Sequence, residues 1–183
     1  MNTTISNTIL SAQMIPGFDP VIGYWLWAIE DTRCRTKEAL IKLDHRVLNW
    51  VAPSNGLSIS TLLYHIAAIE ADWLYAEILG GVDFPFEINE LFQFKLRDDD
   101  GKLTSIKGES LSSHWHRLDV VRRYFLATFD SMPLDEFRRQ RKLDQYHVTP
   151  EWVLHHLIQH EAEHRGLIME IRNMGEDYLE ISM

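Results

Sequence analysis

Apolar residues recur every three or four positions in four long segments of the chain, which is the spacing of a helix with one apolar face. Each segment follows a side chain that can cap a helix: Asp19, Ser58, Ser110 or Ser112, and Thr149. Proline comes directly after Asp19 and Thr149, at the helical position where it is best tolerated. The pattern predicts four principal helices.

The predicted helices end at positions that are typical of turns. Their stops are the turn at 52–56, Gly80-Gly81, Pro133 and Gly175. The first helix is expected to run towards Leu43, with a short extra turn near 47–50. Residues 82–109 lack helical periodicity and predict a long irregular connection between the second and third helices, with a short hairpin. A connection of this length often covers a site.

These elements predict an all-α fold. Four helices with short or medium connections are typical of a four-helix bundle in which neighbouring helices are antiparallel. With 183 residues, 45% of them hydrophobic, the chain has enough apolar mass for one core. We therefore expect one helical domain over 1–183, with residues 1–18 as an N-terminal extension.

Charge and composition argue against several classes of protein. A net charge of −9 repels the phosphate backbone, so we expect no nucleic-acid partner. The longest apolar stretch, 21–29, is far too short to span a bilayer, so we expect no membrane partner. No basic residue precedes Arg33, so a secretory signal is not expected. The lone Cys34, expected to be buried, allows no intrachain disulfide and favours the cytoplasm.

Three histidines carry the candidate chemistry. His160 and His164 are four residues apart, so on a helix their imidazoles project to one side and can share a metal ion. A third ligand must come from a facing helix, and His65 lies on the apolar stripe of the second helix. Alone, His65 would be read as a hydrogen-bonded core residue. Together the three predict one divalent transition metal, with zinc or nickel suited best and iron, cobalt or manganese also compatible.

Residues 160–164 (HEAEH) also match the H-E-x-x-H signature of zinc peptidases. In that reading Glu161 is the general base, and Glu161 is the leading acid or base candidate in any case. Its alternative role is a carboxylate that orients a ligand or lies at the surface. A peptidase also needs a third ligand downstream, and no histidine follows His164. The peptidase is therefore our third hypothesis.

Other residues near this motif have two readings each. We expect His156 to lie beside the metal site or in the core, and His155 at the surface or at a packing edge. Three tryptophans could line an apolar pocket over the metal or belong only to the core: Trp73, Trp115 and Trp152. The basic cluster 138–142 is either a solvated loop or an anchor for an anionic ligand.

Residues 61–70 (TLLYHIAAIE) and 160–168 (HEAEHRGLI) together resemble the DinB/YfiT-like metalloenzymes, over residues 21–174. The resemblance implies an up-down-down-up four-helix bundle, frequent homodimers and a mononuclear site whose ligands here are His65, His160 and His164. It also implies thiol S-transferase or isomerase activity with bacillithiol, mycothiol or glutathione. The family's Gly-Gln after the second ligand is Gly166-Leu167 here, so any role of that amide is lost.

We therefore predict a metal-dependent enzyme that acts on a small molecule. Three imidazoles leave coordination positions open, so both thiol S-transfer, with a low-molecular-weight thiol as cosubstrate, and hydrolysis are available. The alternative is a non-enzymatic, metal-stabilised bundle that acts as a binding or assembly module. The sequence names neither the substrate nor the physiological metal.

Overall fold

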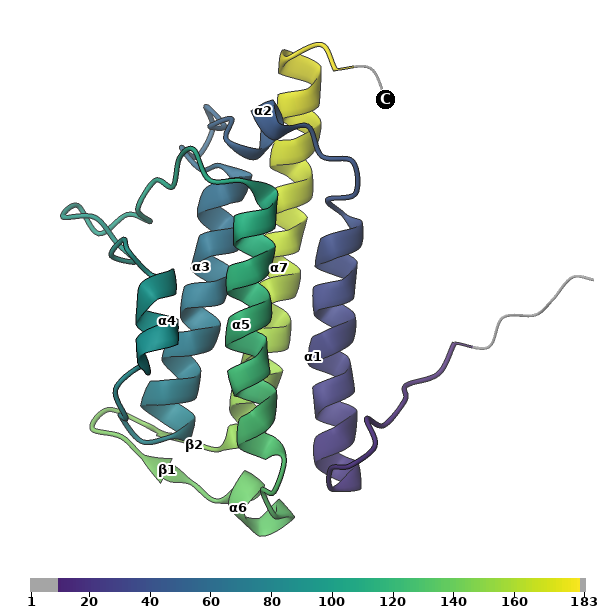
Figure 1. The fold of residues 1–183 in the computed structure, drawn as a ribbon, viewed down its shortest axis with the longest axis vertical. Coiled ribbons are helices and arrows are strands. Elements are labelled where there is room, and N and C mark those ends of the chain that lie inside the picture. Colours follow the sequence, from purple (N-terminus) through teal and green to yellow (C-terminus); the bar gives the residue numbers. More distant parts are fainter. Residues whose placement is uncertain (1–9, 182–183) are drawn as a thin grey trace, which may run out of the picture.

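The computed structural model describes residues 10–181, and 59% of the chain is helical, which confirms the all-α class (Figure 1). The helices are α1 (Pro20–Glu38), α2 (His45–Leu48), α3 (Ile59–Asp72), the π-helix η1 (Trp73–Ile78), α4 (Phe86–Leu91), α5 (Leu111–Phe129), α6 (Leu134–Arg138) and α7 (Pro150–Tyr178). The antiparallel strands β1 (Arg141–Lys142) and β2 (His147–Val148) pair Arg141 with Val148. Of the predicted extension, residues 1–9 lie outside the described part, and 10–18 form no helix or strand.

The predicted caps begin the long helices. Each cap side chain accepts a hydrogen bond from a backbone amide of the first turn, so an otherwise unpaired donor is satisfied. The cap residues are Asp19, Ser58, Ser110 and Thr149, with Ser110 rather than Ser112 before α5.

Two helix ends differ from the prediction. The first helix ends at Glu38, short of Leu43, and the separate helix α2 (His45–Leu48) overlaps the stretch 47–50 where an extra turn was expected. The last helix does not stop at Gly175. A Cβ at Gly175 would lie 2.9 Å from Cγ1 of Val47 and 3.1 Å from the ring of Trp50. This glycine therefore gives α2 room to pack on α7 instead of ending the helix.

The long connection 82–109 is less irregular than predicted. It contains the short helix α4, and an isolated antiparallel bridge joins Arg97 and Leu103, where a hairpin was expected. The hydroxyl of Tyr64 donates to the carbonyl of Phe94 at 2.8 Å and accepts from its amide at 3.0 Å. The connection is thereby fastened to α3 next to His65.

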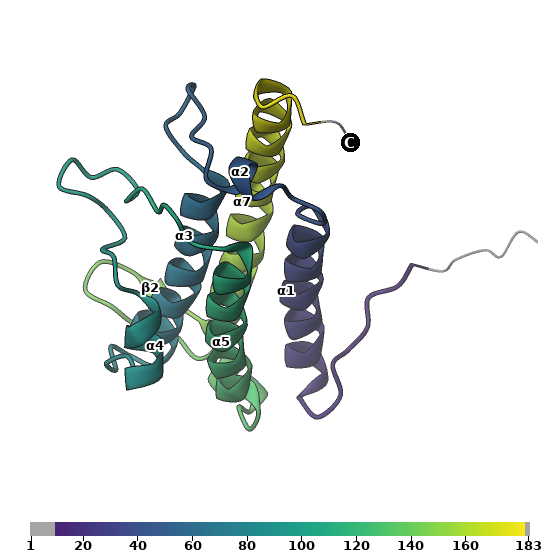
Figure 2. The same cartoon turned by 45° about the horizontal axis from the view of Figure 1, so that its top comes forward.

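The four long helices lie side by side in both views (Figures 1 and 2). α1 packs on α7, and α3 packs on α5 and α7. In Figure 1, α1 and α7 run upward while α3 and α5 run downward. Within the described part of the chain, no helix combines the length and apolar character needed to cross a membrane.

The buried apolar residues fall into two clusters. The first cluster, towards the β1–β2 end, includes Ile29 of α1 and Leu157 of α7. The second cluster, towards α2, includes Leu40 of α1 and Ile168 of α7. On both helices the residues between the clusters include charged side chains, and the candidate site lies at this level.

Candidate metal centre

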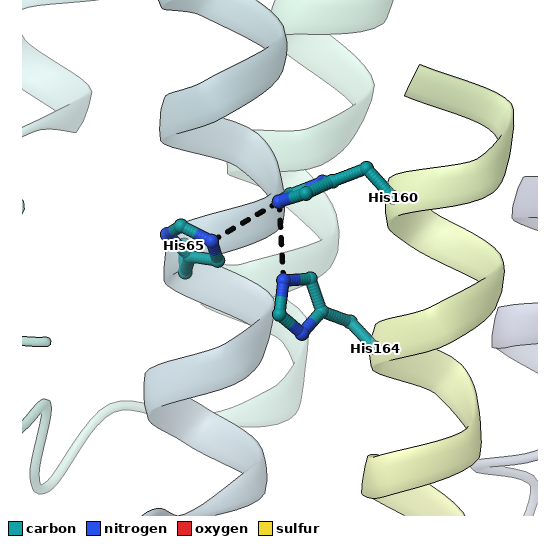
Figure 3. A group of neighbouring side chains, drawn as sticks. All are labelled: His65, His160 and His164. Atoms are coloured by element: carbon teal, nitrogen blue, oxygen red, sulfur yellow. Dashed lines mark hydrogen bonds between the residues drawn. The ribbon is translucent and has the colours of Figure 1, made fainter. Parts of the chain in front are cut away.

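Three histidine rings meet between α3 and α7. The Nε2 atom of His160 lies 3.1 Å from Nε2 of His65 and 3.1 Å from Nε2 of His164 (Figure 3). One nitrogen from each ring lies within 4.8 Å of the other two. The helical spacing places His160 and His164 on one side of α7, and the packing of α3 brings His65 opposite them. The structure thus brings together the three residues that the sequence predicted as ligands.

The imidazoles are neutral at physiological pH. Burial, reinforced by the neighbouring His164, lowers the pKa of His65 to about 4. Burial and the two other rings lower the pKa of His160 to about 3. Burial also lowers the pKa of His164. Each ring therefore presents a lone pair, which is the form that binds metal ions.

The three rings do not satisfy one another as a hydrogen-bonded set. Nε2 of His160 faces two other ring nitrogens, and a ring nitrogen carries at most one proton. Among the described residues, the buried Nδ1 of His65 has no hydrogen-bond partner. With a zinc–nitrogen distance of about 2.0–2.1 Å, two ligands of one tetrahedral ion lie roughly 3.3 Å apart. The donor set therefore fits a divalent transition metal.

The carboxylate of Glu161 lies in a buried ion pair and makes no hydrogen bond to the three histidines. Its Oε1 accepts from Nε of Arg33 at 2.9 Å and its Oε2 from the Nη2 atom of Arg33 at 3.1 Å. Only 2% of Glu161 is exposed. Its helical position, about 100° from His160, directs it into the helix interface.

Glu161 belongs to a buried ion network that we define as Arg33, Glu70, Arg122 and Glu161, one residue from each long helix. Arg33 also donates to Glu70 at 2.7 Å, and Arg122 donates to Glu70 at 2.6 and 2.9 Å. Burial alone would raise the pKa of Glu70, but the two guanidinium groups hold it below its usual value. The network joins all four helices at the level of the histidines.

Sequence reasoning missed Arg33 and Arg122 as parts of the site. A signal was present, because Arg33 lies on the buried stripe of its helix, four residues after Ile29 and three before Thr36. A charged residue on an apolar stripe indicates a buried ion pair, although it does not name the partner.

The other residues singled out with the 160–164 motif differ in their burial and contacts. His155 is exposed, as expected, and His156 is half-buried against the rings of Trp73 and Trp152. Trp115 lies on α5 and packs against the second cluster. The expectation for Cys34 was wrong: it is exposed, because it follows the inward-facing Arg33 and its side chain points off the buried stripe.

Three arginines of the basic cluster 138–142 form ion pairs with two nearby acids. Arg138 pairs with Glu151 at 3.1 Å, while Arg139 and Arg141 pair with Glu136 at 2.6 and 2.7 Å. These contacts favour a solvated structural stretch over an anion anchor.

Comparison with known proteins places most of the helical region in one family. Residues 26–175 match the model of the family described as Mycothiol-S-transferase. The matched region includes all three histidines and the whole buried ion network. No curated protein matches the chain.

Proposed function

The chain belongs to the mycothiol-S-transferase family, a DinB/YfiT-like family, and from this premise we propose that it is a metal-dependent thiol S-transferase. The convergence of the three Nε2 atoms, 3.1 Å apart in two pairs, carries the proposal. The family supplies the reaction class, and the histidines supply a place for the metal.

We propose that His65, His160 and His164 hold one divalent ion, with zinc or nickel as the leading candidates. A divalent ion on three neutral imidazoles keeps open positions and lowers the pKa of a thiol that reaches it. The protein's part is to keep three rings deprotonated and aimed at one point.

The proposed reaction joins a low-molecular-weight thiol to an electrophilic carbon. The sulfur electron pair forms the new S–C bond, the bond to the leaving group breaks with its electron pair, and the thiol proton passes to water. No oxidant or reductant is needed. Mycothiol, which the family description names, is the first thiol to test, followed by bacillithiol and glutathione.

The arrangement of the long helices supports the finer fold assignment. We propose that α1, α3, α5 and α7 form a four-helix bundle, because they lie side by side in both views (Figures 1 and 2). Their directions, up, down, down and up, are those the resemblance implies. A single domain, a homodimer and a cytoplasmic location remain part of the proposal and need separate tests.

We assign Glu161 a positioning role in place of acid or base catalysis. Both of its oxygens accept hydrogen bonds from Arg33, and neither is hydrogen-bonded to the three histidines. A peptidase of the H-E-x-x-H type needs that carboxylate to activate water. This contact disfavours the peptidase hypothesis.

The test combines metal analysis with a transfer assay. The untagged protein is purified without chelators or nickel resin, analysed for metals, and assayed with each thiol and monochlorobimane, in which chloride is the leaving group. We expect about one divalent ion per chain and a rate proportional to metal content. The variant His160→Ala should lose both, whereas His155→Ala, five residues earlier on α7 and exposed, should keep both.

Three results would overturn the proposal: full metal content in His160→Ala, a parent protein that cannot be loaded with zinc, nickel or manganese, or a metal-loaded protein inactive with every thiol. Metal-dependent hydrolysis of esters or amides without thiol transfer would replace the transferase by the hydrolase. Stabilisation by metal without any turnover would favour the binding module.

A further inference from the structure

A row of aromatic side chains leads from the metal centre to the β1–β2 hairpin. Trp152, His156 and His160 are spaced four residues apart along one face of α7. The rings of Trp152 and His156 stack at 5.2 Å with 7° between their planes, and His156 lies 5.9 Å from His160. From η1, Trp73 approaches His156 to 4.5 Å and Trp152 to 5.5 Å.

A cavity of about 450 Å³ lies at the hairpin end of this row. It is lined by Gln140, Tyr146, His147, Val148, Thr149 and Trp152. Trp152 and Tyr146 are 47% and 44% exposed, although aromatic rings of this size are usually covered. The two exposed rings line the same cavity, so together they indicate a binding surface. Single exposed aromatic residues scattered over the surface would not indicate one.

The walls of the cavity are held in place. The Tyr146 hydroxyl donates to Oε1 of the buried Glu77 at 2.7 Å, and Thr149 caps α7 through the amide of Trp152. Tyr146 is also 6.5 Å from the ring of Trp73. The aromatic walls are therefore preorganised, which reduces the entropy lost on binding.

The lining selects the chemistry of the ligand. None of the side chains that line the cavity is an aspartate, glutamate, lysine or arginine. The lining therefore offers a charged group no ion-pair partner in exchange for the water it displaces. An uncharged aromatic or flat apolar group would instead stack on Trp152 and Tyr146. The volume falls within the range of small-molecule sites, roughly 300–1,000 Å³.

We propose that this cavity and the aromatic row bind the uncharged aromatic part of the electrophilic cosubstrate. The link to an electrophile rests on the proposed function, whereas the binding site itself does not. Eight residues separate Trp152 from His160, about 12 Å along the helix at 1.5 Å per residue. The cosubstrate is therefore an elongated molecule whose apolar group lies about that far from its reacting carbon.

The binding test uses N-phenyl-1-naphthylamine, an uncharged aromatic probe that fluoresces in apolar sites. In metal-free protein we expect saturable binding, with energy transfer from tryptophan to the probe. Trp152→Ala should raise the dissociation constant about tenfold or more, the equivalent of about 1.4 kcal/mol. Tyr24→Ala removes an aromatic ring of similar exposure, 51%, from α1 and should leave binding unchanged. Circular dichroism checks folding, and Trp152→Gln is used if the alanine variant does not fold.

A second measurement places the probe relative to the histidines. In protein loaded with one equivalent of Co²⁺, the bound probe should be quenched, and in His160→Ala it should not. Bound probe without quenching in the loaded parent would overturn the link to the metal centre. Failure of Co²⁺ to bind would contradict the proposed function. The probe-binding test on metal-free protein would still be valid.

The binding proposal is overturned if the parent shows no saturable binding, or if Trp152→Ala binds the probe as well as the parent. It is also overturned if Tyr24→Ala loses binding to the same extent. Absence of probe binding, combined with a dimer that Trp152→Ala dissociates in sedimentation, would assign this face to a second copy of the chain.

Discussion

Arg33 shows how one side chain can connect the site to the core. Its guanidinium binds the carboxylates of Glu161 and Glu70, which lie on the same two helices as the three histidines. Removing the cation leaves these two buried carboxylates with Arg122 alone, which is hydrogen-bonded to Glu70 and lies 3.7 Å from Oε2 of Glu161. Removing one partner of a buried ion pair lowers the stability of the protein by more than the intact pair contributes to it, because the remaining charge stays buried without a partner.

We predict that Arg33→Met lowers the free energy of unfolding by about 3–5 kcal/mol, measured by urea denaturation. The matched control is Arg35→Met on the same helix. Arg35 is paired with Asp31 at the surface, so its replacement should lower the free energy of unfolding far less. Equal losses in the two variants would show that the buried ion network contributes no more than a surface pair.

The buried histidines predict a pH dependence for the metal-free protein. In the folded state the pKa values of His65 and His160 are about 4 and about 3, below the ordinary value of 6.5. The unfolded chain therefore binds protons first as the pH falls. The stability from these groups is fully present well above pH 6.5 and is lost progressively as the pH falls through 6.5, down to about 4 for His65 and about 3 for His160.

The check is the free energy of unfolding of the metal-free protein at intervals between pH 7.5 and 4.5. His160→Ala should flatten the decline, while His155→Ala, which alters an exposed ring, should leave its slope unchanged. A parent whose stability rises as the pH falls through this range would contradict the assignment of neutral, buried rings.

At the scale of an element, α7 offers two glycines with opposite roles. A Cβ at Gly166 would meet no atom within 4 Å, whereas a Cβ at Gly175 would meet Val47 at 2.9 Å. Gly166→Ala should stabilise the protein by about 0.5–1 kcal/mol, because glycine is the poorer helix former. Gly175→Ala should destabilise it by about 1–3 kcal/mol, because α2 must move. Thermal and urea unfolding of both variants measure the difference, and equal shifts would contradict the packing of α2 on α7.

The long helices could be predicted because their signals are local. A cap, a first-turn proline and an apolar period all lie within one segment, as at Thr149 and Pro150. The end of α7, the helix α4 and the β1–β2 hairpin depend on contacts with distant segments. Gly175 has the local features of a helix stop, and only its contacts with Val47 and Trp50 show why the helix continues.

The candidate site shows the same difference between local sequence signals, which could be predicted, and contacts between distant segments, which could not. His160 and His164 were paired by spacing on one helix, and His65 by its place on an apolar stripe. The partner of Glu161 could not be predicted, because Arg33 lies 128 positions away and pairing depends on how α1 packs on α7. Spacing defines a face of a helix, and packing decides what that face meets.

For the whole molecule, metal binding should act as a stabiliser. An ion that binds only the folded state adds about 2.7 kcal/mol when its free concentration is 100 times its dissociation constant. We predict that zinc raises the melting temperature of the parent and leaves that of His160→Ala unchanged, measured by calorimetry in a buffer that does not chelate. An equal rise in the melting temperature of both proteins would show that zinc binds outside the three-histidine site.

The apolar core is divided into two clusters, and this affects how the protein tolerates substitutions. The buried ion network lies between two apolar clusters, so residues such as Phe129 and Leu48 share no cluster. Energetic effects of distant, unconnected sites add within about 0.3–0.5 kcal/mol. Phe129→Leu and Leu48→Ala should therefore be additive in a double-mutant cycle. Substitutions at the end that carries the aromatic row can then change ligand specificity without amplifying the destabilisation caused by substitutions at the opposite end, which continues to stabilise the fold.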